Sequence, residues 1–336
     1  MATAPLIAII TPTRNRLALL RETMDSVAAQ SLAAWEHIIV DDGSDDGTAE
    51  EVSRRAAEDP RIRYLPRTGA VAGANACRNQ GAAATAAPLL VFLDSDDLLD
   101  PGALESRVET MGRNQDLDFA VSRTGVFLHT PGDLGREFDT ERAGDDLLRF
   151  LYFETPWQTT APTWRRESFD RLGGFDEALP SWQDVDLHVR ALTGDLLYLR
   201  LTQVDHHMRW REEASRTSTQ QWRSEQHLQS AVRTVGKFER LVREGPGLDW
   251  VRQRALCGLY FGIAERWAVA GRRAEALACW RQIQSRKLGQ TGLYATGAGL
   301  LMLRSLGGEH WPLGDRILNK WKGWARMRTN PELVTP

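Results

Sequence analysis

The sequence predicts an α/β fold, with a mixed but mainly parallel sheet flanked by helices and followed by an α-helical carboxyl-terminal region. Three observations support this prediction. Short β-rich apolar runs alternate with amphipathic segments over the first 100 residues, and three of these runs end in polar clusters. Beyond residue 220 strand patterns become rare, and segments with helical spacing are separated by Gly or Pro.

The sheet is predicted from four apolar runs separated by three amphipathic segments. We expect strands at 6–11, 37–41, 62–65 and 89–93, and helices at 17–29, 48–59 and 74–86. Such an alternation of strands and helices is typical of parallel neighbours. After residue 118 the pattern loosens, and we expect further strands at 119–122 and 126–129 before a Gly/Asp-rich loop at 131–145.

The chain is long enough for two packed regions, because one hydrophobic core seldom serves 336 residues. We expect a first domain at 1–218, with halves at 1–118 and 119–218, and a helical region at 219–336. The helices expected in that region are 220–243, 249–270, 272–285, 290–306 and 312–327. The two segments that meet near Gly271 are similar to one tetratricopeptide unit, although repeat folds need several copies.

Composition and charge exclude several classes of protein. A hydrophobic content of 42%, a charged content of 26% and a net charge of −3 are those of an ordinary globular protein with no general attraction for nucleic acid. The three cysteines have no metal-binding spacing and are too few for a disulfide scaffold, which favours a reducing cytoplasm. Neither a signal-peptide pattern nor a run of about 20 apolar residues is found, so we expect a cytoplasmic protein.

The most informative segment is residues 89–97, in which five apolar residues are followed by three aspartates and Ser95. An ionised carboxylate costs several kcal/mol to remove from water unless a cation or hydrogen-bond donors compensate it. A helix cap near Pro101 needs only one such side chain. Three acids at the end of a buried strand therefore favour a hard divalent cation, with capping by Ser95 or Asp96 as the alternative.

Polar clusters at the ends of three expected strands should lie on one rim of the sheet. They are residues 11–15, 41–44 and 94–97, and ligands of open parallel sheets bind beyond the carboxyl ends of the strands. Turn chemistry, with Thr48 capping the next helix, explains the second cluster by itself. It does not explain all three clusters together.

In these motifs the chain resembles the inverting family-two glycosyltransferases of the GT-A fold. The matching segments, in the family's order, are residues 9–16, 39–48, 76–81 and 92–97. The resemblance covers roughly residues 5–215 and is specific as an ensemble. It implies a hexosyltransferase-type enzyme that moves a sugar from a nucleotide-diphosphate donor, a UDP-sugar above all, to an acceptor hydroxyl. The half at 1–118 would bind the nucleotide and the half at 119–218 the acceptor.

The resemblance implies a set of nucleotide-sugar-binding residues. Residues 11–13 would line the nucleotide pocket, and Asp41 would accept a hydrogen bond from the base edge. Guanidinium groups carry fixed donor forks for phosphate oxygens, which suits Arg14 and Arg78 to the pocket or the diphosphate. A solvated loop charge is the alternative for Arg14. The expected set is Thr11, Pro12, Thr13, Arg14, Asp41, Arg78, Asp94 and Ser95.

Asp94 and Asp96 resemble the family's DxD motif, which holds Mg²⁺ or Mn²⁺ against the donor diphosphate. The cation stabilises negative charge that develops on the leaving nucleotide diphosphate. By this resemblance Asp94 and Asp96 are the expected metal ligands. Asp97 stays open between the metal shell and a helix cap.

A departure from the family puts a third metal contact in doubt. Many relatives carry a His shortly after the position of Arg209, where this chain has Trp210. His206 and His207 are near in sequence, but alternation along a strand points them to opposite faces of the sheet. At most one of them can face the metal, and a structural role is compatible with both.

The resemblance also implies a catalytic base, which we assign to Asp184. A base must meet the acceptor hydroxyl on the side of the sugar opposite the diphosphate. The family often carries Glu-Asp here, whereas this chain has Gln183 and Asp184, which removes one charge and keeps the Asp. The alternative is that Asp184 caps the helix that follows. The turn at 173–177 also matches the family, in which it lies beside the donor sugar.

Two other functions are alternatives. A sugar nucleotidyltransferase would need a Gly-rich, basic triphosphate loop after the first strand, and residues 11–15 do not supply one. A non-catalytic adaptor that binds a partner through its helical end is supported only by the Gln183 and Trp210 departures. The acceptor is not indicated, and a saccharide, a lipid-linked sugar, a small molecule and a protein are all compatible with the motifs.

Tryptophans suggest where partners could bind. The last expected helix combines Trp321 and Trp324 with basic residues, a mixture suited to peripheral contact with an anionic membrane on its cytoplasmic face. A protein acceptor, a homodimer and a merely solvated basic helix are the alternatives. Trp157, Trp164 and Trp182 are candidates either for stacking on sugar rings or for filling the core.

Overall fold

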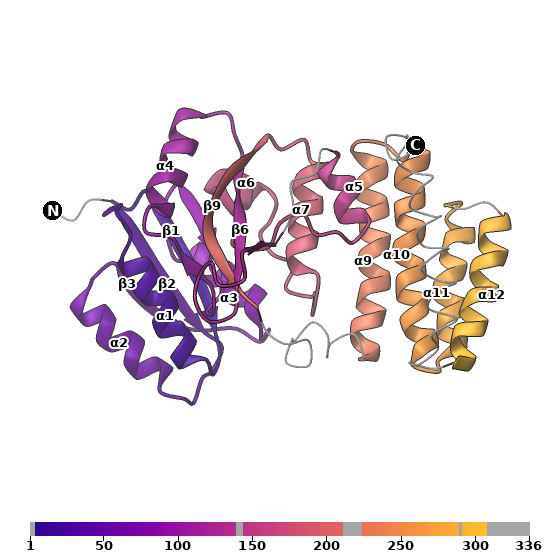
Figure 1. The fold of residues 1–336 in the computed structure, drawn as a ribbon, viewed down its shortest axis with the longest axis horizontal. Helices are drawn as coiled ribbons and strands as arrows, with labels where there is room; N and C mark the ends of the chain where they lie inside the picture. The colour runs from indigo at the N-terminus through magenta and orange to yellow at the C-terminus, as the bar shows by residue number, and fades with distance from the viewer. Residues whose placement is uncertain (1–3, 139–143, 211–223, 289–290, 308–336) are drawn as a thin grey trace. The chain divides into compact units, whose positions relative to one another are not determined.

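The computed structural model describes residues 4–138, 144–210, 224–288 and 291–307 (Figure 1). The chain divides into two compact units, the first formed by Met1–Arg142 with Thr155–Arg211 and the second by Ala143–Glu154 with Glu212–Pro336. The sequence-based division at residue 218 assigns residues 143–154 and 212–218 to the first domain instead. Helix α5 (Asp146–Leu151) belongs to the second unit because it packs against α10 (Trp250–Val269) of that unit.

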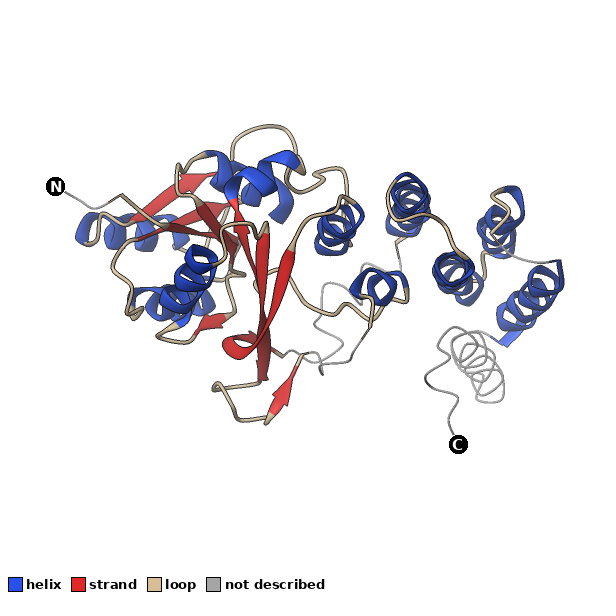
Figure 2. Cartoon of the chain, turned by 90° about the horizontal axis from the view of Figure 1, so that it is seen from above, coloured by secondary structure: helices blue, strands red, loops and turns tan. Residues whose placement is uncertain are grey.

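The first unit begins with the four parallel strands and three helices predicted from the sequence. Figure 2 shows the strands of the chain in red and the helices in blue. Strand β1 lies between β2 and β4, and β3 pairs with the outer side of β2. The strands are β1 (Ile7–Thr13), β2 (Trp35–Asp41), β3 (Ile62–Pro66) and β4 (Leu89–Phe92). The helices are α1 (Leu17–Ala28), α2 (Thr48–Glu58) and α3 (Ala74–Ala83).

The later part of the first unit makes the sheet mixed, in the order β3-β2-β1-β4-β8-β6-β9-β5, with β7 on β6. Strand β8 is antiparallel to β4 and to β6, whereas β6 and β9 are parallel. The additional strands are β5 (Leu98–Leu99), β6 (Phe119–Phe127), β7 (Arg136–Glu137), β8 (Pro162–Arg165) and β9 (Tyr198–Arg209). The additional helices are α4 (Ala103–Arg113), α6 (Arg166–Arg171) and α7 (Gln183–Thr193). The two strands expected at 119–122 and 126–129 are a single strand, β6, because a bulge against β9 lets the pairing continue.

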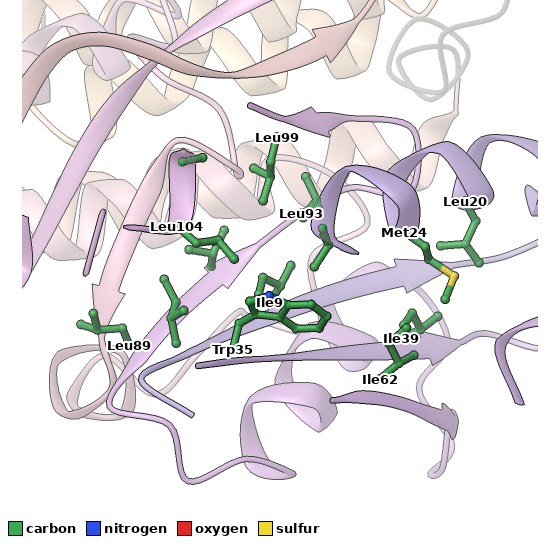
Figure 3. Close-up of a cluster of buried hydrophobic side chains, with 14 of the residues drawn as sticks. Ile9, Leu20, Met24, Trp35, Ile39, Ile62, Leu89, Leu93, Leu99 and Leu104 are labelled. Atoms are coloured by element: carbon green, nitrogen blue, oxygen red, sulfur yellow. The ribbon is translucent and has the colours of Figure 1, made fainter. Parts of the chain in front are cut away.

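The main core of the first unit lies between one face of the sheet and the helices α1, α2 and α4 (Figure 3). Leu20, Met24 and Val27 recur on one face of α1 and are buried against the strands. Ile9 and Ile39 meet them, because alternate residues of a strand point to the same face. Each such side chain contributes about 1.5–3 kcal/mol when fully buried, so this face fixes the orientation of the parallel strands.

Helix α3 covers the opposite face of the same strands, where a glycine permits close approach. A Cβ atom added at Gly81 would lie 2.4 Å from Cγ2 of Ile10 and 3.2 Å from Cγ2 of Val40. Both neighbours are β-branched, and their restricted χ1 angles leave them little room to move aside. The glycine therefore brings α3, and the residues it carries, close to the ends of β1 and β2.

We expect Gly81→Ala to destabilise the first unit by about 1–3 kcal/mol, the usual range for overpacking a core. The matched control is Gly112→Ala near the end of α4, where an added Cβ meets nothing within 4 Å. That variant should be neutral or gain up to about 1 kcal/mol from helix propensity. Urea unfolding followed by far-ultraviolet circular dichroism measures both changes. Equal midpoints for the two variants would contradict the close packing at Gly81.

The second unit is helical. Its helices are α5, α9 (Glu225–Glu244), α10, α11 (Arg273–Ser285) and α12 (Thr291–Gly307). The rings of Phe261 in α10 and Trp280 in α11 meet edge to face, with centroids 5.3 Å apart, and Gly297 of α12 packs on Trp280. The helices on either side of Gly271 are thus in contact, and their likeness to a tetratricopeptide unit stays a prediction.

Four of the five helices expected at the carboxyl-terminal end are found, and the fifth, at 312–327, lies outside the described residues. The proposed membrane contact through Trp321 and Trp324 lies there too. Among the helices that the structure describes, none combines the length and the apolar character needed to cross a membrane.

Candidate active site

The ends of β1, β2 and β4 bring the three polar clusters to one rim of the sheet. The strands are parallel, and their register pairs Thr13 with Asp41 and Ile10 with Phe92. Residues that follow Thr13, Asp41 and Phe92 therefore leave the sheet on the same side. The prediction from the sequence that these clusters share one rim is confirmed.

The end of β1 is anchored in the core. The hydroxyl of Thr11 lies 2.9 Å from Nε2 of His37, a buried contact. Burial, with the nearby charge of Arg55, lowers the pKa of His37 to about 3, so the imidazole is neutral. The side chain of Thr11 is thus engaged inside the fold, whereas the buried hydroxyl of Thr13 has no hydrogen-bond partner among the described residues. Pro12, between them, is buried as well.

Asp41 is held in a fixed orientation at the end of β2. Its Oδ1 accepts hydrogen bonds from the backbone N–H of Ser44, at 3.0 Å, and from the Ser44 hydroxyl, at 2.6 Å. Its Oδ2 accepts one from the Tyr64 hydroxyl, at 2.9 Å. Burial and this hydrogen bond raise the pKa of Tyr64 to about 12, so the phenol stays a donor. A carboxylate has about four acceptor positions, which leaves Asp41 able to accept a further hydrogen bond.

The two arginines of the loop after β1 differ in their surroundings. The side chain of Arg14 is 63% exposed and its Nη1 is 3.9 Å from Asp42. The side chain of Arg16 is 34% exposed, and its Nη1 is 3.3 Å from Oδ1 of Asp96. The loop is held between them, since the backbone N–H of Asn15 donates to the Ser44 hydroxyl at 2.9 Å. The sequence singled out Arg14, but it is Arg16 that reaches the acidic turn, which is formed by residues 94–97 after β4.

Arg78 of α3 reaches the acidic turn from the other direction. Its Nη2 donates to Oδ1 of Asp94 at 2.6 Å, and its side chain is only 4% exposed. The guanidinium lies over the Phe175 ring, 5.2 Å from the centroid. The remaining nitrogens of this guanidinium, Nε and Nη1, are buried and have no hydrogen-bond partner among the described residues. A buried arginine with unused donors suits an anionic ligand.

Asp97 belongs to the frame of the turn. It is buried, its backbone N–H donates to the Asp94 carbonyl, and its Oδ1 accepts from the backbone N–H of Arg209 at 3.1 Å. Arg209 also donates from Nε to the Asp96 carbonyl at 3.2 Å. Burial and the charges of Asp96 and Asp94 raise the pKa of Asp97 well above its usual range. These contacts of Asp97 join the turn to β9. Ser95, in the middle of the turn, is buried.

The carboxylates of the acidic turn fit one kind of metal site. Within the described ranges, no group of three or more His, Cys, Asp or Glu side chains is arranged to hold a metal ion. Mg²⁺ is commonly bound by one or two carboxylates together with substrate phosphates and water. The pair of Asp94 and Asp96 therefore fits a divalent cation that binds together with a diphosphate, and does not fit a cage formed by the protein alone.

The two histidines of β9 are held by different contacts. His206 is buried, with Nδ1 2.8 Å from Asp205 and Nε2 2.8 Å from the Thr124 hydroxyl. His207 lies 3.0 Å from Asp100 through Nε2. The second ring nitrogen of His207, Nδ1, is buried and has no hydrogen-bond partner among the described residues, and a structural role for both histidines stays a prediction.

Helix α3 also holds the turn that precedes α7. Asn79 accepts from the backbone N–H of Phe175 at 2.9 Å and donates to the Phe175 carbonyl at 2.9 Å. Asn75 donates to the carbonyls of Asp176 and Leu179, and Arg190 of α7 donates to the Gly174 carbonyl at 2.7 Å. The same helix therefore positions Arg78 toward the acidic turn and fixes the chain leading to Asp184.

Asp184 lies in the first turn of α7. The residue before the helix is Trp182, with φ 63°, and Asp184 Oδ1 accepts from the backbone N–H of Val185 at 2.8 Å. Burial raises the pKa of Asp184, and the charge of Asp94 adds to the rise. The Val185 N–H and the charge of Arg78 lower it, but less.

The candidate aromatic platforms lie in the core. Trp157 and Trp164 are 2% and 0% exposed, and Trp164 stacks on Phe119 with a centroid distance of 4.4 Å. Trp182 is 8% exposed. The structure therefore supports a core-filling role for these tryptophans and not a role in stacking on sugar rings. The sequence alone did not distinguish these two roles.

The order of the strands and the polar clusters at the rim of the sheet define the class of fold, which is the GT-A type of nucleotide-sugar transferases. Residues 8–173 match the family model described as "Glycosyl transferase family 2". The chain belongs to this family.

Curated relatives support the same family. A GalNAc(5)-diNAcBac-PP-undecaprenol beta-1,3-glucosyltransferase of Campylobacter jejuni is 31% identical over 151 residues, which are 43% of this chain and 48% of that protein. A validoxylamine A glucosyltransferase of Streptomyces hygroscopicus subsp. jinggangensis is 38% identical over 104 residues, which are 30% and 24% of the two chains. The chain spans about half the length of the first curated relatives that it matches.

Solved structures share the fold at low identity. Staphylococcus aureus TarS 1–349 in complex with UDP-GlcNAc has a TM-score of 0.58 and 14% identity, covering 96% of this chain and 88% of TarS 1–349. The mannosyltransferase PcManGT of Pyrobaculum calidifontis, in complex with GDP-Man and Mn²⁺, has a TM-score of 0.54 and 18% identity, covering 98% and 88%. At these identities the likeness is one of fold.

Proposed function

We propose that this chain is an inverting glycosyltransferase that moves a sugar from a nucleotide-diphosphate donor to an acceptor hydroxyl. The observation that carries the proposal is that one helix, α3, directs Arg78 to Asp94 and also holds the turn that leads to Asp184 at the start of α7. Membership of glycosyl transferase family 2 supports the same reaction class.

On the donor side, Asp41 accepts a hydrogen bond from the nucleotide base and Arg78 binds the diphosphate. Arg78 has two unused donors, Nε and Nη1, in a buried position where a charged hydrogen bond is strong. A Mg²⁺ or Mn²⁺ ion bound by Asp94 and Asp96 would neutralise charge on the leaving nucleotide diphosphate. Because Arg78 is enclosed, it holds the diphosphate in one place while the sugar reacts.

On the acceptor side, Asp184 is the general base. The acceptor oxygen forms a bond to the anomeric carbon as the bond to the diphosphate oxygen breaks, and the hydroxyl proton passes to the Asp184 carboxylate. A base works best when its pKa approaches the working pH, and burial raises the pKa of Asp184 in that direction. Attack from the side opposite the leaving group inverts the anomeric centre.

Donor turnover tests this function. The purified chain with Mn²⁺ or Mg²⁺ is incubated with a panel of nucleotide sugars, beginning with UDP-GlcNAc and GDP-Man, the ligands named for the TarS and PcManGT structures. We expect release of the nucleoside diphosphate from at least one donor. Acceptors in the panel include lipid-linked saccharides, because the Campylobacter relative is named for a PP-undecaprenol substrate. A membrane-bound acceptor of this kind would require peripheral contact with a membrane.

Matched variants make the test specific. Asp96→Asn should abolish metal-dependent release, whereas Asp116→Asn, an equal change at an exposed loop position, should not alter it. Binding of a donor without turnover across the panel would favour a non-catalytic adaptor. Pyrophosphate release from a sugar phosphate and a nucleoside triphosphate would favour a nucleotidyltransferase.

A further inference from the structure

Each of the two candidate metal-binding carboxylates has an arginine beside it. Arg78 donates to Asp94 at 2.6 Å, and Arg16 approaches Asp96 at 3.3 Å. The two arginines are held very differently: the Arg78 side chain is 4% exposed and rests on Phe175, whereas the Arg16 side chain is 34% exposed. Arg78 is therefore fixed in place, and Arg16 is free to change its direction.

We infer that Arg16 is a second donor-phosphate-binding residue, which pairs with Asp96 in the ligand-free protein and turns to the diphosphate when a divalent cation binds Asp96. This inference rests on the proposed function. It assigns the role to Arg16 in place of Arg14, which is 63% exposed and closest to Asp42, at 3.9 Å.

Arg16 is expected to change its partner because of the charge that a cation brings to Asp96. A cation at this carboxylate places two further positive charges beside a guanidinium that already lies 3.3 Å from Oδ1. Arg16 and the cation therefore compete for Asp96, because like charges at this separation repel. A bound diphosphate removes the competition, since its oxygens offer the displaced guanidinium a new anionic partner within reach of the same loop.

Because Arg16 and the cation compete for Asp96, replacing Arg16 should change the affinities for Mn²⁺ and for UDP in opposite directions. Arg16→Gln removes the charge that competes for Asp96, so the nucleotide-free protein should bind Mn²⁺ about two- to fivefold more tightly, the size of a partly exposed charge pair. The same variant loses a phosphate contact, so UDP should bind about tenfold more weakly at saturating Mn²⁺, as for one charged hydrogen bond. A residue that only supported the acidic turn would weaken both.

Two further variants serve as controls. Arg21→Gln makes the same change of charge on α1, where the Arg21 side chain is 49% exposed and lies 3.4 Å from Glu51, and both affinities should stay within about twofold of wild type. Arg16→Lys keeps the charge and loses the planar fork, so Mn²⁺ affinity should match wild type while UDP affinity is intermediate. Circular dichroism melting verifies that each variant is folded.

The experiment uses the full chain in two titrations. Mn²⁺ binding without nucleotide is measured by the loss of the electron paramagnetic resonance signal of free Mn²⁺, and UDP binding at saturating Mn²⁺ by isothermal titration calorimetry. Weaker Mn²⁺ binding in folded Arg16→Gln, or unchanged UDP binding, overturns the inference and leaves the proposed function intact. If the wild-type protein binds neither Mn²⁺ nor UDP, both the inference and the proposed function fail.

Discussion

Replacing Asp184 with Asn is expected to lower the rate of sugar transfer by about 10²–10⁴-fold, the usual contribution of a general base. Asparagine has nearly the same shape and can still accept from the Val185 N–H, so the start of α7 should be preserved. It cannot take the proton of the acceptor hydroxyl. Affinity for the nucleotide should change little, because Asp184 is assigned to the acceptor side.

Single-turnover transfer and UDP titration separate these two effects. The matched control is Asp195→Asn, an exposed aspartate just after the other end of α7, with φ 55°. Asparagine tolerates that backbone conformation, so this variant should transfer at the wild-type rate. If Asp184→Asn also transferred at a rate near wild type, the assignment of the base would be wrong.

The pH dependence of the single-turnover transfer rate should show the ionisation of the Asp184 carboxyl group. Asp184 acts as a base only when ionised, and burial raises its pKa above the ordinary aspartate value of about 3.9. The single-turnover rate should therefore fall as the pH drops through that raised pKa, at a higher pH than for an exposed aspartate. A rate that stayed constant down to the ordinary aspartate pKa would contradict a base with a raised pKa.

The parts of the fold predicted from the sequence are those set by local pattern. Ile9, Ile39 and Leu89 belong to short apolar runs bounded by turn residues, and such runs identify strands without knowledge of their neighbours. The parallel order follows from the helices between them. The acidic turn could likewise be located, because charge at the end of an apolar strand is visible in the sequence.

The parts that could not be predicted depend on contacts between distant residues. Pairing of β6 with β8 and β9 joins segments whose own patterns are weak, so β6 was divided in two and β8 was not recognised. The choice between Arg14 and Arg16 depends on how the loop after β1 is held by Ser44, about 30 residues away. Residue type and spacing do not distinguish two arginines in one loop.

The clearest feature that could not be predicted from the sequence is a buried polar network next to the acidic turn. Arg107 of α4 donates to both oxygens of Asp205 on β9, at 2.7 and 2.8 Å, and to the Thr160 carbonyl at 3.0 Å. The Ser122 hydroxyl donates to Asp205 at 2.9 Å. Arg107 is 1% exposed and Asp205 is 2% exposed. The network ties α4 to β9 four residues before Arg209, which supports the acidic turn.

Arg107→Met should destabilise the first unit by about 3–5 kcal/mol, the range for removing one partner of a buried ion pair. The loss arises because Asp205 is left as a buried charge without its counter-ion, more than because an attraction is lost. The control is Arg113→Met in the same helix, where the side chain is 77% exposed and pairs with Glu109. An exposed pair of this kind should change stability by less than about 1 kcal/mol. Urea unfolding monitored by circular dichroism measures both variants.

Neutralising both partners distinguishes a buried charge from lost packing. In Arg107→Met with Asp205→Asn no unpaired charge is left, so the double variant should be more stable than the sum of the single changes predicts, by about 1–3 kcal/mol.

Acid unfolding gives an independent check of the Arg107–Asp205 pair. Burial by itself would raise the pKa of Asp205, but the charge and hydrogen bonds of Arg107 and a hydrogen bond from His206 outweigh it and hold the pKa well below its usual range. The stabilisation is thus complete above the unfolded aspartate pKa of about 3.9 and is lost as the pH falls toward the depressed folded value. Strictly additive single changes, or acid unfolding of Arg107→Met at the wild-type pH, would show that the pair does not contribute in this way.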